Sequence, residues 1–332
     1  MTPQPPNRAW LRSLLHFGGS VLALVILFRF LPLGEVWATL GRLPLELWVL
    51  VVAGYLTAHL TAVSKWRLMI NLGGAGLNFR QSVRCYFSGL FSTLLLPSVI
   101  GGDVVRAGLA LRSTRSKAAV LVGSFLDRLI DFLALAILAA IGALLVPGEL
   151  APESRRVFVT VGVSIAILAL ILISIVLWFP ARKFSFRIRR ALVRLRNAAH
   201  SVRRQPEYVV ASGCLALVVQ GSFIWLTAQV AAASGLHLPL RAWLFAWPLA
   251  KISALVPLTQ GGIGVREAAL AALLAPFGAR AVLTVAVGLA WEAVIITGGL
   301  VAGLTAFILA RFSVAQAHEP VGSSARQTEK QA

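Results

Sequence analysis

The sequence contains little charge of either sign and very few acids. Of its 332 residues, 13% are charged and 12 are Asp or Glu, whereas 58% are hydrophobic. A soluble protein of this length needs more charge to cover its surface, so the composition excludes a soluble enzyme or binding domain. Several segments reach about 20 apolar residues, the length that crosses a bilayer core. The sequence therefore predicts an all-α polytopic membrane protein.

Cysteine and histidine are also scarce. Cys85 and Cys214 lie in apolar segments, and neither has a cysteine or histidine neighbour at a metal-ligand spacing. We interpret both as buried small hydrophobic residues. No nucleophile–base pair and no nucleotide-binding motif is present. We therefore expect no metal site, no cofactor and no enzymatic activity.

Positive charge is plentiful, with a formal net charge of +19, but it is unevenly distributed. The segment 182–204 holds nine Lys or Arg and no acid, and it lies between two apolar stretches. Cytoplasmic loops of membrane proteins are basic, and such loops attract anionic headgroups. We interpret 182–204 as a cytoplasmic loop that binds anionic lipids and not nucleic acid.

Apolar segments and charged loops together predict the topology. Full spans are expected at 13–33, 44–64, 118–146, 156–179, 208–234 and 281–310. Two further stretches, 85–111 and 242–277, have similar charge on both flanks. We expect each to enter and leave on one side of the membrane as a re-entrant hairpin. The alternative is a single kinked span in each stretch.

This topology divides the chain into two halves, 13–146 and 156–310, whose hairpins enter from opposite sides. Such an inverted-topology repeat is the architecture of many transporters. Residues 13–310 then form one transmembrane domain between two cytoplasmic tails, 1–12 and 311–332. We expect the protein in the cell membrane with both termini in the cytoplasm, and homo-oligomerisation stays open.

One motif, P-x-x-x-G-G-x-x-x-R, lies in the middle of both hairpins. It reads PSVIGGDVVR from Pro97 to Arg106 and PLTQGGIGVR from Pro257 to Arg266. Proline ends a helix, and paired glycines let the chain reverse. The next half-helix then presents its free N–H groups and positive dipole end to an anion, and its arginine suits phosphate. Two such ends predict a phosphate-sized site, while close helix packing is the alternative role of the glycines.

Five of the 12 acids fall in segments that we place in the membrane: Asp103, Asp127, Asp131, Glu267 and Glu292. Buried acids pair with bases or line polar cavities. We expect Asp103 to be the N-cap of the returning half-helix, and Asp127 and Asp131 to share one helix face. For Asp127 and Arg128, a structural ion pair with a hairpin arginine and direct substrate contact both stay open. We interpret Lys65-Trp66-Arg67 as a membrane-interface anchor.

The predicted substrate-binding residues are the glycines and arginines of the two motifs and the charged residues placed in the membrane. They are Gly101, Gly102, Asp103, Arg106, Asp127, Arg128, Asp131, Lys251, Gly261, Gly262, Gly264, Arg266, Glu267 and Glu292.

Four segments carry a resemblance to a known family: KWRLMINLGG, FSTLLLPSVIGGDVVRAGLAL, SFLDRLIDFLAL and ALVPLTQGGIGVREAALAALL. Together they resemble the flippase-like transmembrane domain family, the membrane region of lysylphosphatidylglycerol synthases, over roughly residues 10–310. The resemblance implies two re-entrant hairpins and lipid movement across the bilayer. No aminoacyltransferase domain follows residue 310, so we expect a stand-alone member that does not aminoacylate lipids. Trp291-Glu292 stands where the family implies an arginine.

The function that we expect is transbilayer movement of a lipid with a phosphate or anionic headgroup. Phospholipids and polyprenyl-phosphate-linked lipids both fit this description. The alternative is an ion-coupled secondary transporter of a small soluble anion, which shares the inverted repeat. The partners that we expect are the lipid substrate and the anionic lipids at the basic loop.

Overall fold

The computed structural model describes residues 41, 43–96, 99–146, 193, 197, 200–202, 204–254 and 262–317. Within these residues the protein is helical and contains no strand. The elements are α3 (Leu45–Leu72), α4 (Phe79–Leu95), α5 (Val99–Ser113), α6 (Lys117–Leu144), α9 (Pro206–Ala233), α10 (Leu240–Ser253), α11 (Val265–Leu274), η3 (Ala275–Phe277) and α12 (Ala281–Ala317). The predicted all-helical class is confirmed.

The long helices coincide with predicted spans. Three described segments are long and apolar enough to cross a membrane, namely Leu45–Leu72, Pro206–Ala233 and Ala281–Phe312. The fourth long helix, α6, matches the span predicted at 118–146 and differs from the others by its charged residues Asp127, Arg128 and Asp131. The spans predicted at 13–33 and 156–179 lie outside the described residues.

Each of the two unusual stretches forms a pair of short helices. The first stretch becomes α4 and α5, and the second becomes α10 and α11. The two members of each pair pack on one another. Helix α4 begins with a reciprocal cap, in which Asn78 Oδ1 accepts from the Gln81 N–H at 2.8 Å and the Asn78 N–H donates to Gln81 Oε1 at 3.0 Å.

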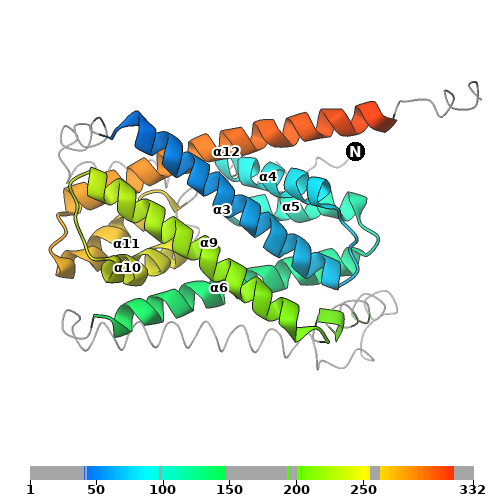
Figure 1. The fold of residues 1–332 in the computed structure, drawn as a ribbon, viewed down its shortest axis with the longest axis horizontal. Helices are drawn as coiled ribbons and strands as arrows, with labels where there is room; N and C mark the ends of the chain where they lie inside the picture. Colours follow the sequence, from blue (N-terminus) through cyan, green and yellow to red (C-terminus); the bar gives the residue numbers. More distant parts are fainter. Residues whose placement is uncertain are drawn as a thin grey trace, which may run out of the picture.

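The first two helices of each half begin at the same interval along the chain. Leu45 and Pro206, which begin α3 and α9, are 161 residues apart, and so are Phe79 and Leu240, which begin α4 and α10. The equivalent helices run in opposite directions: the colours in Figure 1 show that α3 and α9 are antiparallel, as are α6 and α12. The long helices α3 and α6 of the first half therefore run opposite to α9 and α12 of the second half.

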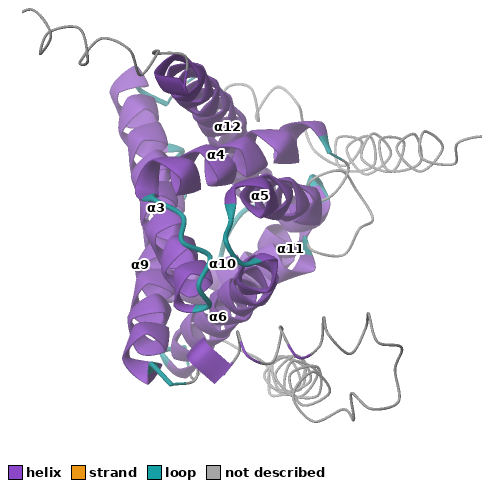
Figure 2. Cartoon of the chain, turned by 90° about the vertical axis from the view of Figure 1, so that its right-hand side faces the viewer, coloured by secondary structure: helices purple, strands orange, loops and turns teal. Residues whose placement is uncertain are grey.

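The two units are interlocked through their short helices. Helix α4 packs on α12 and α10 packs on α6, so each short pair contacts the last long helix of the other unit. Helices α3 and α9 pack together as one layer, and Figure 2 shows α5 and α11 on the side away from that layer. Glycines permit the close approach, because a Cβ on Gly303 of α12 would lie 2.6 Å from Phe91 Cδ2 of α4.

Candidate functional site

The second glycine motif has the backbone that the sequence predicts. Gly262 and Gly264 have φ angles of +77° and +86°, in the left-handed region that glycine adopts without strain. Helix α11 begins directly afterwards at Val265. Its first turn is already capped, because the Gly264 N–H donates to Glu267 Oε2 at 2.7 Å. A resident carboxylate thus occupies the place predicted for a bound anion, while Gly261 lies outside the described residues.

The first motif differs from the prediction. Helix α5 begins at Val99, so Gly101 and Gly102 lie inside the helix and do not have positive φ angles. The prediction of Asp103 as an N-cap is therefore wrong, because Asp103 lies beyond the first helical turn. The glycine at 102 serves packing: a Cβ there would lie 2.6 Å from the carbonyl oxygen of Gly89 on α4. The alternative role of close helix packing is confirmed here.

Six charged residues form a closed cycle of alternating sign in the first unit, which we call the ionic ring. Helix α3 contributes one base, α5 an acid and a base, and α6 two acids and a base. In order around the cycle they are Lys65, Asp127, Arg106, Asp103, Arg128 and Asp131. With three acids and three bases, the ring carries no net charge, as burial requires.

The contacts around the ring differ in length. Lys65 Nζ lies 2.8 Å from Asp127 Oδ1 and 2.6 Å from Asp131 Oδ1. Arg106 Nη2 is held more loosely, at 3.3 Å from Asp103 Oδ1 and 3.4 Å from Asp127 Oδ2. Arg128 pairs with Asp103 and lies 3.3 Å from Asp131 Oδ2. The Asp127 and Asp131 carboxylates share one face, as the sequence predicts, and Lys65 bridges them.

Arg106 has two buried nitrogen atoms without a hydrogen-bond partner, whereas Arg128 has one such nitrogen atom in the described part of the ring. The Arg106 side chain is 2% exposed, and its Nε and Nη1 groups have no hydrogen-bond partner in the described part of the chain. The guanidinium lies between two aromatic rings, with Cζ 4.9 Å from the centroid of Trp66 and 4.8 Å from that of Tyr86. These faces favour the cation but accept no N–H hydrogen bond in the guanidinium plane. Two donors therefore remain available to an anion.

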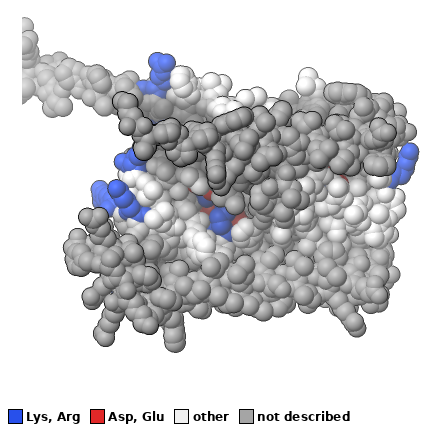
Figure 3. Space-filling model, turned by 180° about the vertical axis from the view of Figure 1, so that it is seen from behind, with Lys and Arg blue, Asp and Glu red and all other residues white. Residues whose placement is uncertain are grey.

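The ring is buried at one end and open at the other. Lys65 and Asp127 are each 1% exposed, whereas Asp103 is 27% and Arg128 is 39% exposed. On the face shown in Figure 3, basic and acidic atoms gather together near the middle. Ligand access to the ring therefore lies on the side of Asp103 and Arg128.

A smaller cluster in the second unit, the Arg266 cluster, surrounds its motif arginine. Arg266 Nη2 lies 2.7 Å from Glu267 Oε1, 2.9 Å from Glu292 Oε2 and 3.3 Å from the Gly288 carbonyl oxygen. Its Nε donates to Glu267 Oε1 at 3.1 Å. Arg266 is thus held by two carboxylates and a carbonyl, more firmly than Arg106.

Lys251 lies apart from both clusters. Its Nζ donates to Gln220 Oε1 at 2.8 Å and lies 4.8 Å from the centroid of Phe223. A row of aromatic contacts leads from Phe223 to His59, at 5.3 Å between centroids, and from His59 to Tyr86, at 5.9 Å. Because Tyr86 contacts Arg106, this row connects Lys251 with the ionic ring.

The structure brings the predicted residues together in two groups and not in one. Arg106 joins Asp103, Asp127, Arg128 and Asp131 in the ring, while Arg266 joins Glu267 and Glu292. Among the described helices, α5 and α11 do not pack extensively on one another. The prediction that the two motif arginines share one phosphate site at paired helix ends is not borne out by this arrangement.

Lys65 is the functional candidate that the sequence interpretation missed. We expected it at the membrane interface, but it is buried in the ring with Trp66 beside it. Charge balance was the available signal. Five acids were placed in the membrane against four bases, so a fifth buried base was required. Lys65 is that base.

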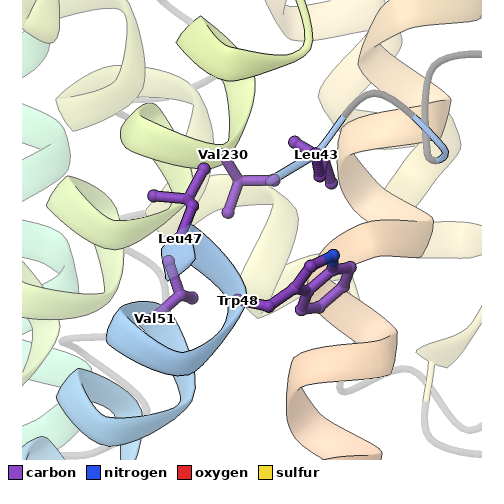
Figure 4. Close-up of a pocket in the computed structure, with 5 residues that line it drawn as sticks. All are labelled: Leu43, Leu47, Trp48, Val51 and Val230. Carbon is purple, nitrogen blue, oxygen red and sulfur yellow. The ribbon is translucent and has the colours of Figure 1, made fainter. Parts of the chain in front are cut away.

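Other kinds of site have less support. No group of three or more potential metal ligands occurs among the described residues. A shallow depression lies where the start of α3 meets α9, and Figure 4 shows its lining of Leu43, Leu47, Trp48, Val51 and Val230. These side chains offer hydrocarbon and an indole ring but no charge, so the depression does not suit an anionic headgroup.

The fold and the buried charges define a helical membrane protein with an ionic network in its interior. A family model described as the lysylphosphatidylglycerol synthase TM region matches residues 13–303. The chain therefore belongs to that family, as its motifs indicate, and its function concerns membrane lipids. No curated protein and no solved structure matches the chain.

Proposed function

We propose that this protein moves a lipid with a phosphate or other anionic headgroup between the two leaflets, without chemical conversion. Phospholipids and polyprenyl-phosphate-linked lipids both meet this description. Membership of a family named for a lipid synthase supports a lipid as the substrate. Unused donors on a buried arginine support an anionic headgroup.

We also infer the arrangement in the membrane. Helices α4, α5, α10 and α11 have 17, 15, 14 and 10 residues, which corresponds to about 26, 23, 21 and 15 Å at 1.5 Å per residue. A hydrocarbon core is about 30 Å thick. Each short pair then enters and leaves on the same side of the membrane, as a re-entrant hairpin. The two hairpins lie among six full spans. The opposite directions of the two units support an inverted-topology repeat (Figure 1).

The proposal includes an orientation and a location. The segments 13–33 and 156–179 complete the six spans, which places both termini in the cytoplasm of a protein in the cell membrane. The basic loop 182–204 then contacts anionic lipids on the cytoplasmic side. Nucleic acid is not a partner in this proposal.

One observation carries the function: the two partnerless nitrogen atoms of Arg106, Nε and Nη1, inside a ring of exchangeable ion pairs. A phosphate oxygen that accepts from Arg106 adds negative charge beside Asp103. Asp103 can then shift entirely to Arg128, its other partner, so that neither carboxylate nor phosphate is left unpaired. Exchange within a ring avoids the cost of about 3–5 kcal/mol that follows when a buried ion loses its partner. The acyl chains stay in the surrounding lipid.

The test is lipid movement in proteoliposomes. A fluorescent phospholipid is distributed in both leaflets, and a membrane-impermeant reductant reports how fast the inner pool reaches the outer leaflet. We expect Arg106→Gln to slow movement about tenfold or more, since a hydrogen bond to a charged group contributes about 1.5–3 kcal/mol. Arg106→Lys should retain part of the rate. Arg112→Gln, an exposed change in the last turn of α5, is the matched control and should leave the rate unchanged.

Two results would contradict the proposal. If Arg106→Gln moves lipid as fast as the wild type, Arg106 does not bind the headgroup. If the wild type moves neither phospholipids nor polyprenyl-phosphate lipids, the protein is not a flippase. Accumulation of a soluble anion in the same vesicles under an ion gradient would then identify the transporter that the sequence left as the alternative.

A further inference from the structure

Lys251 differs from the four cations of the ionic ring and the Arg266 cluster. Each of these four, Lys65, Arg106, Arg128 and Arg266, forms an ion pair with at least one carboxylate. Lys251 has a neutral partner instead, the side-chain oxygen of Gln220 at 2.8 Å. An ammonium group has three N–H donors, and the other two donors of Lys251 have no acceptor among the described residues. A partly buried positive charge with spare donors favours an anionic ligand.

The neighbours of Lys251 can also serve such a ligand. Gln220 is 4% exposed, and its amide nitrogen provides two further donors beside the ammonium group. His59 stacks against the same Phe223 ring that Lys251 faces, and its Nδ1 is buried without a hydrogen-bond partner in the described structure. A neutral imidazole whose Nδ1 carries the proton donates one more hydrogen bond. Lysine, amide and imidazole together suit the oxygens of a phosphate.

The position of Lys251 relates this group to the ionic ring. Lys251 is close enough to Asp131 and Arg128 of the ring, and to Arg266 of the second cluster, for electrostatic interaction. The aromatic contacts from Phe223 through His59 to Tyr86 end at Arg106. This row of packed rings thus connects the surroundings of Lys251 with those of Arg106.

We propose that Lys251, Gln220 and His59 form a second oxyanion site, which holds the phosphate when it is not at the ionic ring. As far as the phosphate belongs to a lipid, this inference rests on the function proposed above. The chemistry is that of a monoanionic or dianionic phosphate group. A lipid headgroup and free inorganic phosphate both provide it, and the experiment separates these sources.

The test counts binding steps on the purified full-length protein in detergent. The probes are dihexanoyl phosphatidylglycerol and inorganic phosphate, titrated separately and followed by calorimetry. We expect one binding step to depend on Lys251: Lys251→Gln should weaken it at least about tenfold, as the loss of a charged hydrogen bond predicts, and Lys251→Arg should preserve it. Lys117→Gln, the same change at an exposed position at the start of α6, is the control.

The second variant is His59→Phe, which keeps the aromatic row and removes only the imidazole donor. It should weaken the same step about threefold to tenfold, the contribution of a neutral hydrogen bond. It also keeps the inference testable if Lys251→Gln does not fold: a weaker binding step in His59→Phe than in the wild type then supports the site, and unchanged titrations overturn it.

Each outcome has one meaning. A Lys251-dependent step for the lipid alone identifies a headgroup site, and one for inorganic phosphate as well identifies a site for the free anion. Titrations that are the same for wild type and Lys251→Gln with both probes overturn the inference. If the wild type moves lipid but no binding step depends on Lys251, the proposed flippase function stands and the oxyanion site is refuted. If a binding step depends on Lys251 but the wild type moves no lipid, the oxyanion site stands and the flippase function is refuted.

Discussion

Removal of Lys65 should be among the most destabilising single changes in the protein. Lys65 is 1% exposed, and its ammonium group contacts both Asp127 and Asp131. Lys65→Met leaves the ionic ring with three acids and two bases, so one negative charge stays buried without compensation. Loss of one partner of a buried ion pair costs about 3–5 kcal/mol, and we expect about 4 kcal/mol here.

A second substitution tests the cause of that loss. Asp127→Asn alone also unbalances the ring, but Lys65→Met with Asp127→Asn leaves two acids and two bases. The double variant should therefore be more stable than the sum of the single effects predicts, by about 1–3 kcal/mol, as found for residues of one buried network. Reversible unfolding in mixed micelles with sodium dodecyl sulfate, followed by tryptophan fluorescence, measures all three free energies.

The control for this cycle is Lys117→Met, which removes the same side chain at an exposed position and should leave the free energy of unfolding unchanged. If the effects of Lys65→Met and Asp127→Asn simply add, the two residues do not act through one charge balance, and the ring as described here is not a unit. A loss below about 1 kcal/mol for Lys65→Met would contradict its burial as an ion-paired ammonium.

Two further predictions concern packing in the same unit. Gly102→Ala should destabilise the protein by about 1–3 kcal/mol, because the new Cβ would lie 2.6 Å from the Gly89 carbonyl oxygen. Gly108→Ala in the same helix is the control: its new Cβ would have no neighbour within 4 Å, so the change should be neutral or stabilising in the same unfolding assay. Trp66→Phe should be more stable than Trp66→Leu by about 1 kcal/mol, since phenylalanine retains an aromatic face beside Arg106. Equal stabilities for the Trp66 variants would show that the aromatic face contributes nothing.

The sequence predicted the long helices well because a 20-residue apolar run has few alternatives to a helix in lipid. Helix α3 at Leu45–Leu72 and α9 at Pro206–Ala233 contain the spans expected at 44–64 and 208–234 almost completely. A charged residue does not always end a membrane helix, however. The predicted span ends before Lys65 and Arg67, whereas the helix continues to Leu72 because Lys65 pairs with carboxylates inside the protein.

The glycine motifs show why a shared pattern does not fix a shared conformation. The motifs are 160 residues apart, whereas the helices that precede them, α4 and α10, begin 161 residues apart. The second unit therefore has one residue fewer before its motif, and there Gly262 and Gly264 turn left-handed, whereas Gly101 and Gly102 stay helical. Glycine tolerates both conformations, so the sequence alone could not decide between them.

Packing around α12 shows why Arg266 is held differently from Arg106. Gly288 of α12 offers Arg266 only its backbone carbonyl oxygen. A side chain has no room there, since a Cβ on Gly288 would lie 2.7 Å from Glu267 Cγ. Glu267 thus fills the space and supplies the carboxylate from the short helix itself.

This difference gives the two units unequal roles in the proposed function. Arg266 receives close contacts from Glu267 on its own helix, and these contacts survive any movement of α11. Arg106 shares its carboxylates loosely and keeps two free donors, so a phosphate can bind there without displacing a strong ion pair. In the second unit the cation with free donors is Lys251 instead. A headgroup that passes between the units therefore exchanges one incompletely paired cation for another, and its charge never has to enter a site that is already neutralised.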